Sequence, residues 1–167
     1  MYKRQTFKVP DPYIPKVGAK IMSLQDPTRK MSKSDENVNS YVALLDKPDD
    51  IMRKFKRAIT DSDAQVRYGE GKDGINNLMG IYSVMTGKTN EEIEREFDGK
   101  GYGDFKLAVG EAVVDHLRPI QEEFTRLIGD KAYLEQCYTK SAEIALRISQ
   151  RTLDKAMKKV GFVKRAF

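Results

Sequence analysis

Residues that build covalent or metal-linked frameworks are scarce in this sequence. The chain holds one cysteine, Cys137, and one histidine, His116, among its 167 residues. A single thiol excludes an internal disulfide framework, and without a second thiol a Cys/His zinc site is excluded as well. No metal bound by protein side chains is therefore expected.

Long apolar runs are missing too. No stretch approaches the roughly 20 apolar residues that cross a bilayer, and residues 1–5 lack the apolar core of a secretory signal. Hydrophobic residues are 40% and charged residues 33% of the chain, with 12 glycines and only 6 prolines. We therefore expect a folded, helix-rich, cytoplasmic protein without a membrane partner. The net charge of +5 permits a nucleic-acid partner without requiring one.

The first part of the chain shows little regular pattern. Residues 1–18 contain three prolines and end at a glycine, so we expect them to be irregular and extended. Residues 19–24 form a short apolar-leaning run that predicts a strand, and residues 41–45 are an ambiguous second one. A lone strand leaves its backbone groups unpaired, so we expect its partners on a missing segment or another chain.

Helical patterns follow from Asp46 onward. Asp46 is expected to cap a helix that begins near Pro48, with apolar residues on one face and basic residues on the other. A second helix is expected to end near Gly87, and Thr89 with Glu92 predicts the capping box of a third. The glycines of residues 99–103 lack a preceding strand, so we interpret them as a helix-joining turn rather than a phosphate cradle.

Two long helices are expected in the last third. An apolar stripe over residues 105–127 contains Pro119, which predicts a kink near residues 115–118 or two helices in tandem. The last helix should begin at residues 129–130 and run to about Gly161, before a basic tail. We expect His116 to be a partly buried structural residue and Cys137 to be a small packing residue.

The chemistry concentrates in residues 27–35, Pro-Thr-Arg-Lys-Met-Ser-Lys-Ser-Asp, which are rich in turn-forming residues and should form an exposed loop. A lysine ammonium on a flexible stem can follow a phosphate as its bond breaks. Lys30 and Lys33 can therefore stabilise a departing pyrophosphate, while Ser32 and Ser34 let backbone N–H groups approach it. The alternative is a solvated surface loop without a partner.

The string Lys30-Met31-Ser32-Lys33-Ser34 is the KMSKS signature of class I aminoacyl-tRNA synthetases. Further segments resemble the bacterial tryptophanyl-tRNA synthetases: residues 18–24 (GAKIMSL), 26–28 (DPT), 58–62 (AITDS), 74–78 (GINNL), 99–106 (GKGYGDFK) and 117–120 (LRPI). These matches extend over residues 14–128, so the resemblance covers most of the chain.

The resemblance implies a specific reaction. The family joins tryptophan to ATP with Mg²⁺, forming an adenylate and pyrophosphate, and then transfers tryptophan to its tRNA. By position, Lys30 and Lys33 would hold the pyrophosphate in the transition state, and Ile21 would contact the adenine. The rest of the ATP-binding loop would be Met31, Ser32 and Ser34. The resemblance raises tRNA contact as a role for four basic residues: Arg53, Lys54, Lys56 and Arg57.

The resemblance also implies a domain organisation. Residues 1–46 would be a remnant of the α/β Rossmann-type catalytic domain, one strand plus the loop. Residues 47–128 would be a helical anticodon-binding bundle, and residues 129–167 a helix and basic tail that pack back toward the catalytic domain. The chain as it stands is thus expected to be mainly α.

Several parts of the family's enzyme are absent from the sequence. There is no HIGH-type motif, and the nucleotide-binding strands, the tryptophan pocket and most of the homodimer interface are missing. We therefore expect the C-terminal half of a ligase, inactive without the missing catalytic half.

Two other readings stay open. One is a free-standing helical tRNA- or RNA-binding module that retains the loop. The other is a fragment of another class I synthetase such as the tyrosine enzyme, which usually departs from KMSKS and lacks the GKGYG segment.

Overall fold

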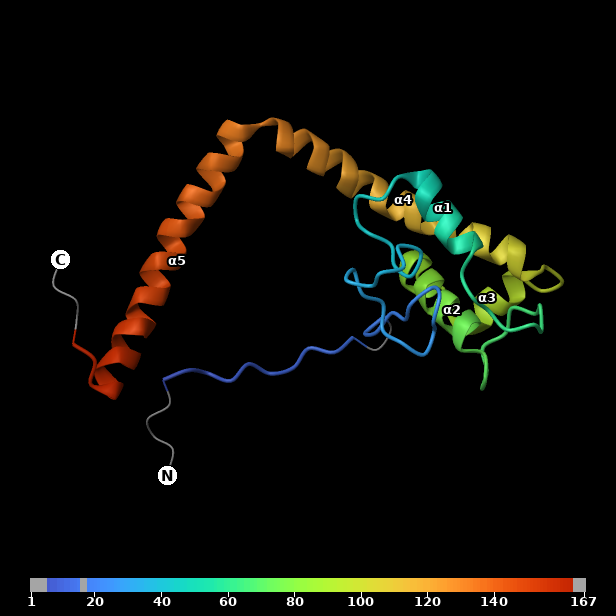
Figure 1. Ribbon diagram of the computed structural model, residues 1–167, viewed down its shortest axis with the longest axis horizontal. Helices are drawn as coiled ribbons and strands as arrows, with labels where there is room; N and C mark the ends of the chain where they lie inside the picture. Colours follow the sequence, from blue (N-terminus) through green and yellow to red (C-terminus); the bar gives the residue numbers. More distant parts are fainter. Residues whose placement is uncertain (1–5, 16–17, 164–167) are drawn as a thin grey trace, which may run out of the picture. The chain divides into compact units, whose positions relative to one another are not determined.

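The computed structural model describes residues 6–15 and 18–163. Within these residues the chain is mainly α-helical, which confirms the expected class. Five helices are present in this part of the chain (Figure 1): α1 (Pro48–Lys56), α2 (Asp73–Thr86), α3 (Asn90–Glu96), α4 (Tyr102–Gly129) and α5 (Lys131–Val160).

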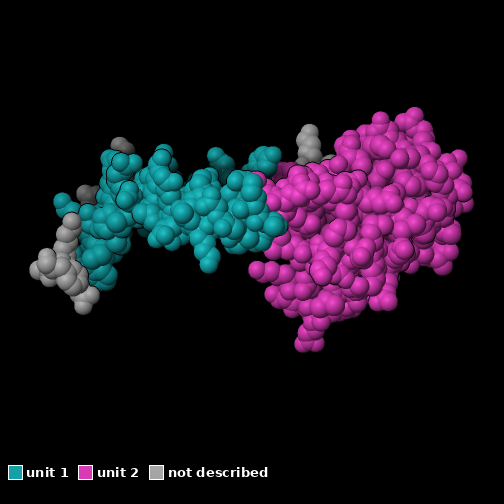
Figure 2. Space-filling view, turned by 90° about the horizontal axis from the view of Figure 1, so that it is seen from above, with its two compact units in different colours: residues 1–13, 124–167 teal, residues 14–123 magenta. Residues whose placement is uncertain are grey.

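The chain divides into two compact units. One comprises residues 14–123, and the other is made of residues 1–13 and 124–167 (Figure 2). Every buried hydrophobic side chain of the described residues lies between Leu24 and Leu117, so the first unit contains the core. α5, in the second unit, contributes no buried side chain.

The predicted first strand is reduced to a single antiparallel bridge between Met22 and Lys30. Its backbone groups were expected to pair with another segment or chain, yet several find partners close at hand. The Leu24 N–H donates to the Ser40 carbonyl (3.0 Å), and the Leu24 carbonyl accepts from the Ile59 N–H (2.8 Å). These two groups of Leu24 have partners without a sheet, because an irregular segment supplies Ser40 and the chain just after α1 supplies Ile59.

The sequence suggested that Asp46 caps α1, and this prediction is wrong. The N-cap residue is Lys47, and it makes no side-chain capping bond. The carboxylate of Asp46 instead accepts from the Ala43 N–H (2.9 Å) and from the Lys54 ammonium (2.5 Å). Residues 41–43 are irregular and residues 44–45 form a turn, so the ambiguous second strand is absent.

Lys54 lies inside the protein rather than on a solvated basic face. It is 4% exposed, and its ammonium pairs with Asp46 and stands 5.0 Å from the ring centroid of Tyr41. A buried ammonium is tolerated when a carboxylate pairs with it. The prediction of one basic face is therefore wrong for Lys54. The other three basic residues predicted for that face are exposed: Arg53, Lys56 and Arg57.

The predicted C-terminal end of α2 and the predicted N-terminal capping box of α3 are confirmed. α2 stops at Gly87, which adopts the left-handed conformation (φ 76°). The Thr89 hydroxyl accepts from the Glu92 N–H (3.4 Å), and the Glu92 carboxylate accepts from the Thr89 N–H (2.8 Å). The capping box is thus present, and the glycine-rich segment after α3 leads into α4 as the expected turn.

Aromatic rings fill the centre of the core. Tyr82 of α2, Phe97 at the end of α3 and Phe105 of α4 pack edge to face, with ring centroids 4.9–5.7 Å apart. α4 also approaches α1 closely. A Cβ added at Gly110 would lie 2.8 Å from the Met52 sulfur, so only glycine fits there without a shift. The core therefore joins α1, α2 and α4 into one body.

α4 runs through Pro119 as one continuous helix, so the prediction of two helices in tandem is wrong. Pro119 and Asp115 are both exposed, so the proline lies on a part of α4 where solvent can replace the helix hydrogen bond that it removes. His116 is exposed rather than partly buried, because the buried stripe passes through Val113 and Leu117 on the neighbouring face.

α5 follows the predicted limits. Asp130 caps it by accepting from the Tyr133 N–H (3.0 Å), and it ends at Gly161 with φ 78°. Cys137 is exposed, so the expected packing role is wrong for the described chain. The predicted basic tail lies mostly outside the described residues. In the residues that the structure describes, no helix has the length and apolarity to span a membrane.

Replacing Lys54 by alanine should lower the free energy of unfolding by about 1–3 kcal/mol, because it leaves the Asp46 carboxylate, itself only 21% exposed, without its cation. The matched control is Lys56→Ala on the exposed face of the same helix, which should change stability by less than about 0.5 kcal/mol. Urea unfolding measured by circular dichroism compares the two variants. Equal losses would contradict the buried pair.

Candidate functional site

The KMSKS loop begins on a short paired stem. Besides the bridge between Met22 and Lys30, the Ser23 N–H donates to the Arg29 carbonyl (2.8 Å). The Met31 N–H donates to the Ile21 carbonyl (3.0 Å) on the other side of the bridge. Backbone hydrogen bonds therefore pair residues 21–23 with residues 29–31, and these two segments are the stem of the loop. Lys30, the first lysine of the signature, is part of this stem.

Turns built from side chains shape the rest of the loop. The Thr28 N–H and hydroxyl both donate to Asp26 Oδ1 (3.1 and 2.6 Å), and the Ser34 N–H donates to Ser32 Oγ (3.2 Å). The Asp35 carboxylate accepts from the N–H two residues further on. Each such bond replaces a backbone partner locally, so an exposed segment without a core of its own keeps a defined shape.

Lys30 and Lys33 are both exposed, and so are Ser32 and Ser34, which confirms the prediction of an exposed loop. Among the described residues neither lysine forms a salt bridge. Their charges are therefore not neutralised by a carboxylate of this part of the chain. An anion that approaches the loop meets two uncompensated ammonium groups three residues apart.

Ile21 and Met31 meet at the base of the loop. Both are half-buried, both pack against the hydrophobic core, and a backbone bond joins them. Ile21 also lines a cleft of about 760 Å³ between the stem, α2 and the start of α3, to which Asn76 and Asn77 contribute. The structure thus brings together Ile21 and Met31, two of the residues predicted to bind ATP, beside an open cleft.

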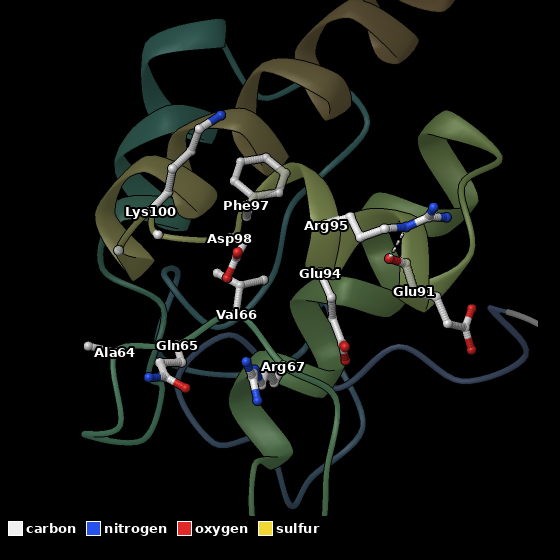
Figure 3. A pocket seen from close by; sticks show the side chains of 12 residues that line it. Ala64, Gln65, Val66, Arg67, Glu91, Glu94, Arg95, Phe97, Asp98 and Lys100 are labelled. Atoms are coloured by element: carbon white, nitrogen blue, oxygen red, sulfur yellow. Dashed lines mark hydrogen bonds between the residues drawn. The ribbon is translucent and has the colours of Figure 1, made fainter.

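A second cleft of about 740 Å³ lies between residues 64–67, α3 and the turn before α4 (Figure 3). Arg67, Arg95 and Lys100 line it, and so do three acidic residues: Glu91, Glu94 and Asp98. Some of these groups are already engaged, since the Arg95 Nε–H donates to the Glu91 carbonyl (3.2 Å; Figure 3). Three basic and three acidic side chains line the cleft, so its lining shows no excess of one charge that would indicate one kind of ion.

The four basic residues proposed for RNA contact do not share one environment. Arg53 pairs with Asp50 (2.6 Å) on the surface of α1, while Lys54 is buried. Lys56 and Arg57 are exposed and make no salt bridge within the described chain. An RNA phosphate can therefore reach three of the four without breaking a buried pair.

A polar pair that no sequence pattern indicated lies at the start of α4. The Tyr102 hydroxyl donates to Asp61 Oδ1 (2.6 Å), and Asp61 Oδ2 is buried without a hydrogen-bond partner in the structure. Burial acts to raise the pKa of Asp61, but the bonds from Tyr102 and from the Asp63 backbone outweigh it and lower that pKa. Burial and Asp61 together raise the pKa of Tyr102. The pair holds the loop before α2 against α4.

No group of three or more His, Cys, Asp or Glu side chains that could hold a metal ion occurs among the described residues.

Comparison with known proteins decides the family. Residues 1–118 match the family model described as "tRNA synthetases class I (W and Y)". The chain belongs to this family. It is 49% identical over 159 residues to a tryptophan–tRNA ligase of Wolinella succinogenes. The aligned residues cover 95% of this chain and 48% of that protein. A tryptophan–tRNA ligase of Clostridium tetani is 48% identical over 158 residues, 95% of this chain and 47% of the relative.

Solved structures agree. A tryptophanyl-tRNA synthetase from Mycoplasma pneumoniae matches with a TM-score of 0.79 at 28% identity, over 89% of this chain and 45% of the other. One from Campylobacter jejuni matches with a TM-score of 0.65 at 20% identity, over 95% and 48%, and supports the fold alone. The chain spans about half the length of the curated relatives it matches. The resemblance to the tryptophanyl-tRNA synthetases is thus confirmed for this class I chain.

The hydrogen bonds that close the first turn of the loop can be tested by titration. The Thr28 hydroxyl, and next its N–H, lower the pKa of Asp26 below its ordinary value of 3.8. Replacing Thr28 by valine keeps the shape and the N–H but removes the hydroxyl, so the pKa of Asp26 should rise toward 3.8. Carbon NMR titration of the carboxyl group measures it.

The sign of the linked effect follows from the direction of the shift. Because the folded-state pKa of Asp26 is lowered, the bonds from Thr28 favour the folded turn above pH 3.8 and lose that effect as pH falls through the folded-state pKa. The control is Thr86→Val, because the Thr86 hydroxyl donates to the Tyr82 carbonyl and forms no hydrogen bond with a carboxylate among the described residues. A pKa of Asp26 that is the same in Thr28→Val and in the unaltered chain would refute the assignment.

Proposed function

We propose that this chain is part of a tryptophan–tRNA ligase, which activates tryptophan with ATP and charges tRNA for tryptophan. The observation that carries the proposal is the 49% identity to a tryptophan–tRNA ligase over 95% of the chain. An intact KMSKS string on an exposed, well-formed loop agrees with it. Mg²⁺ enters this reaction with ATP, as part of the substrate.

Lys30 and Lys33 are the proposed catalytic residues. As tryptophan's carboxylate attacks the α-phosphorus of ATP, the bond to pyrophosphate breaks and negative charge grows on the departing group. Two ammonium groups without a salt bridge in the described part of the chain can follow that charge and lower the barrier electrostatically. Because the loop is held by local turns rather than by a core, it can move toward the substrate at little cost.

The base of the loop is proposed to bind the nucleotide. Ile21 and Met31 offer half-buried apolar surface beside the stem, suited to one face of an adenine ring. The small side chains of Ser32 and Ser34 leave backbone N–H groups accessible to phosphate oxygens.

The remaining helices are proposed to serve tRNA binding and assembly. Residues 1–46 would belong to the catalytic domain, residues 47–128 would form the anticodon-binding bundle, and residues 129–167 would pack back toward the catalytic part. The exposed apolar side chains of α5, among them Leu146, Ile148 and Leu153, support a partner surface for that helix. Arg53, Lys56 and Arg57 are the proposed tRNA contacts in this scheme, and the complete ligase would be a homodimer.

The chain alone is proposed to be inactive, because an adenylate site needs the HIGH-type motif and the amino-acid pocket that the sequence lacks. A purely RNA-binding module would also be inactive in ATP chemistry. The two functions differ once the complementary part of a relative is supplied, since only the ligase fragment then completes an ATP site.

Replacing either loop lysine by alanine should slow tryptophan-dependent ATP–pyrophosphate exchange about 10²–10³-fold, a loss typical of one electrostatic stabiliser in a transition state. The assay combines each variant of the chain with the complementary half of a related ligase. Lys100→Ala is the control, because it removes an exposed lysine outside the loop that has no proposed role in catalysis or binding, and it should leave exchange unchanged. Wild-type rates for both Lys30→Ala and Lys33→Ala would refute the proposed role.

A further inference from the structure

One side chain from the helical core holds the stem of the loop. The Met22 N–H donates to Asn77 Oδ1 (2.9 Å), and Asn77 Nδ2 donates to the Met22 carbonyl (2.8 Å). The primary amide therefore satisfies both backbone groups of one residue, as the next strand of a sheet would. Met22 forms the antiparallel bridge with Lys30. The residue that Asn77 binds is therefore paired directly with the first lysine of the signature.

The helix that carries Asn77 is firmly seated. Its flanking residues Ile75, Leu78 and Met79 are at most 1% exposed. Near the start of the same helix, a Cβ at Gly74 would lie 2.2 Å from the Ile59 carbonyl oxygen, so α2 approaches residue 59 as closely as a glycine allows. Asn77 therefore belongs to a helix that the core holds in place. The stem has only two short arms, residues 21–23 and 29–31, and its position depends on contacts with such an element.

The internal bonds of the stem cannot replace this contact. They join residues 21–23 to residues 29–31, but none of them reaches α2. The bonds of Leu24 to Ser40 and Ile59 hold the adjoining residue, and the amide of Asn77 is the hydrogen-bonding contact from α2 to the stem. On the Met22 side the amide of Asn77 supplies the link to the core, and loss of it leaves a backbone N–H and a carbonyl facing the cleft. Water can satisfy those groups in many positions, so the position of the stem is no longer unique.

The preceding residue offers a natural comparison. Asn76 Nδ2 donates to the Gly69 carbonyl (2.7 Å), and the Gly69 N–H donates to Asn76 Oδ1 (3.1 Å). Two adjacent asparagines therefore bracket two different backbone residues in the same way. Asn76 serves the loop before α2, and Asn77 serves the stem of the KMSKS loop.

We propose that Asn77 is a positioning residue for ATP activation: its amide fixes the stem on α2 and so sets where Lys30 and Lys33 stand. The inference rests on the proposed function of those lysines. Asn77 itself touches no substrate in this scheme. It makes α2, a helix of the proposed tRNA-binding region, part of the machinery that places the catalytic loop.

The first experiment measures the stem directly in the 167-residue chain. Asn77→Asp keeps size and the acceptor for Met22 N–H, but it puts a carboxylate oxygen where an N–H donor faced the Met22 carbonyl. Amide hydrogen exchange by NMR should become at least about tenfold faster at Ser23 and Met31. Asn76→Asp, the matched control, should leave both rates within about twofold and speed exchange around Gly69 instead.

If Asn77→Asp unfolds the chain, Asn77→Ala repeats the measurement, because it removes both bonds without adding a charge. Unchanged exchange at Ser23 and Met31 in the folded variant overturns the proposal. So does an equal effect from the Asn76 variant.

The second experiment asks whether Asn77 acts through the lysines. It uses ATP–pyrophosphate exchange by the chain supplied with the complementary half of a relative, in a double-mutant cycle of Asn77→Asp with Lys30→Ala. A positioning role predicts a loss of about tenfold or more when both lysines are present and a clearly smaller loss in the Lys30→Ala background, where only Lys33 remains to be positioned. A merely structural role lowers activity by the same factor in both backgrounds, and that result overturns the proposal.

The two levels of inference fail in different ways. If Lys30→Ala and Lys33→Ala alone leave exchange unchanged, the proposed function fails and takes the positioning role with it. If those variants are impaired but Asn77→Asp is not, only the positioning role fails.

Discussion

The attachment of the stem to the helical core is the contact on which the candidate site depends. Residues 21–24 carry backbone N–H and carbonyl groups that a longer sheet would satisfy. In this chain the partners come from the returning arm of the loop, from Ser40, from Ile59 and from the side chain of Asn77. Because unpaired backbone groups are costly when they leave water, this pairing decides where the loop can stand.

From the stem outward, the structure changes from firmly to loosely held. Ile21 and Met31 pack on the core, and Lys30 lies exposed on the stem beside them. Lys33 is exposed in a turn that the Ser34 N–H closes by donating to Ser32 Oγ. Such a gradient suits a loop that must be aimed by a rigid base and still move with its ligand. Neither ammonium group forms a salt bridge within the described residues, so both are available to an incoming phosphate.

Much of the helical part could be predicted from local patterns. The capping box at Thr89, the left-handed glycines at 87 and 161 and the buried face of Phe105, Val109 and Val113 depend on neighbours within one or two helical turns, which the sequence displays. The exposure of the KMSKS loop followed in the same way from its turn-forming residues. The resemblance to the family rested on the KMSKS signature and other short segments, which can be recognised in the sequence without a structure.

Long-range partners were not predictable by the same means. Lys54 and Asp46 are eight residues apart, and a helical pattern treats any lysine as solvated, so the buried pair was missed. Pro119 suggested a break, but an exposed proline costs one bond that water replaces. Asn77 lies 55 residues from Met22, and nothing in the string GINN says which backbone its amide will meet.

We propose that the chain holds half of a tryptophan-activating site, with its stem and loop already formed. The most direct test mixes the purified chain with the complementary half of a related ligase and measures ATP–pyrophosphate exchange with each amino acid in turn. We expect no exchange by the chain alone, and exchange with tryptophan but not with tyrosine in the mixture. Exchange by the chain alone, or exchange that depends on tyrosine, would contradict the assignment.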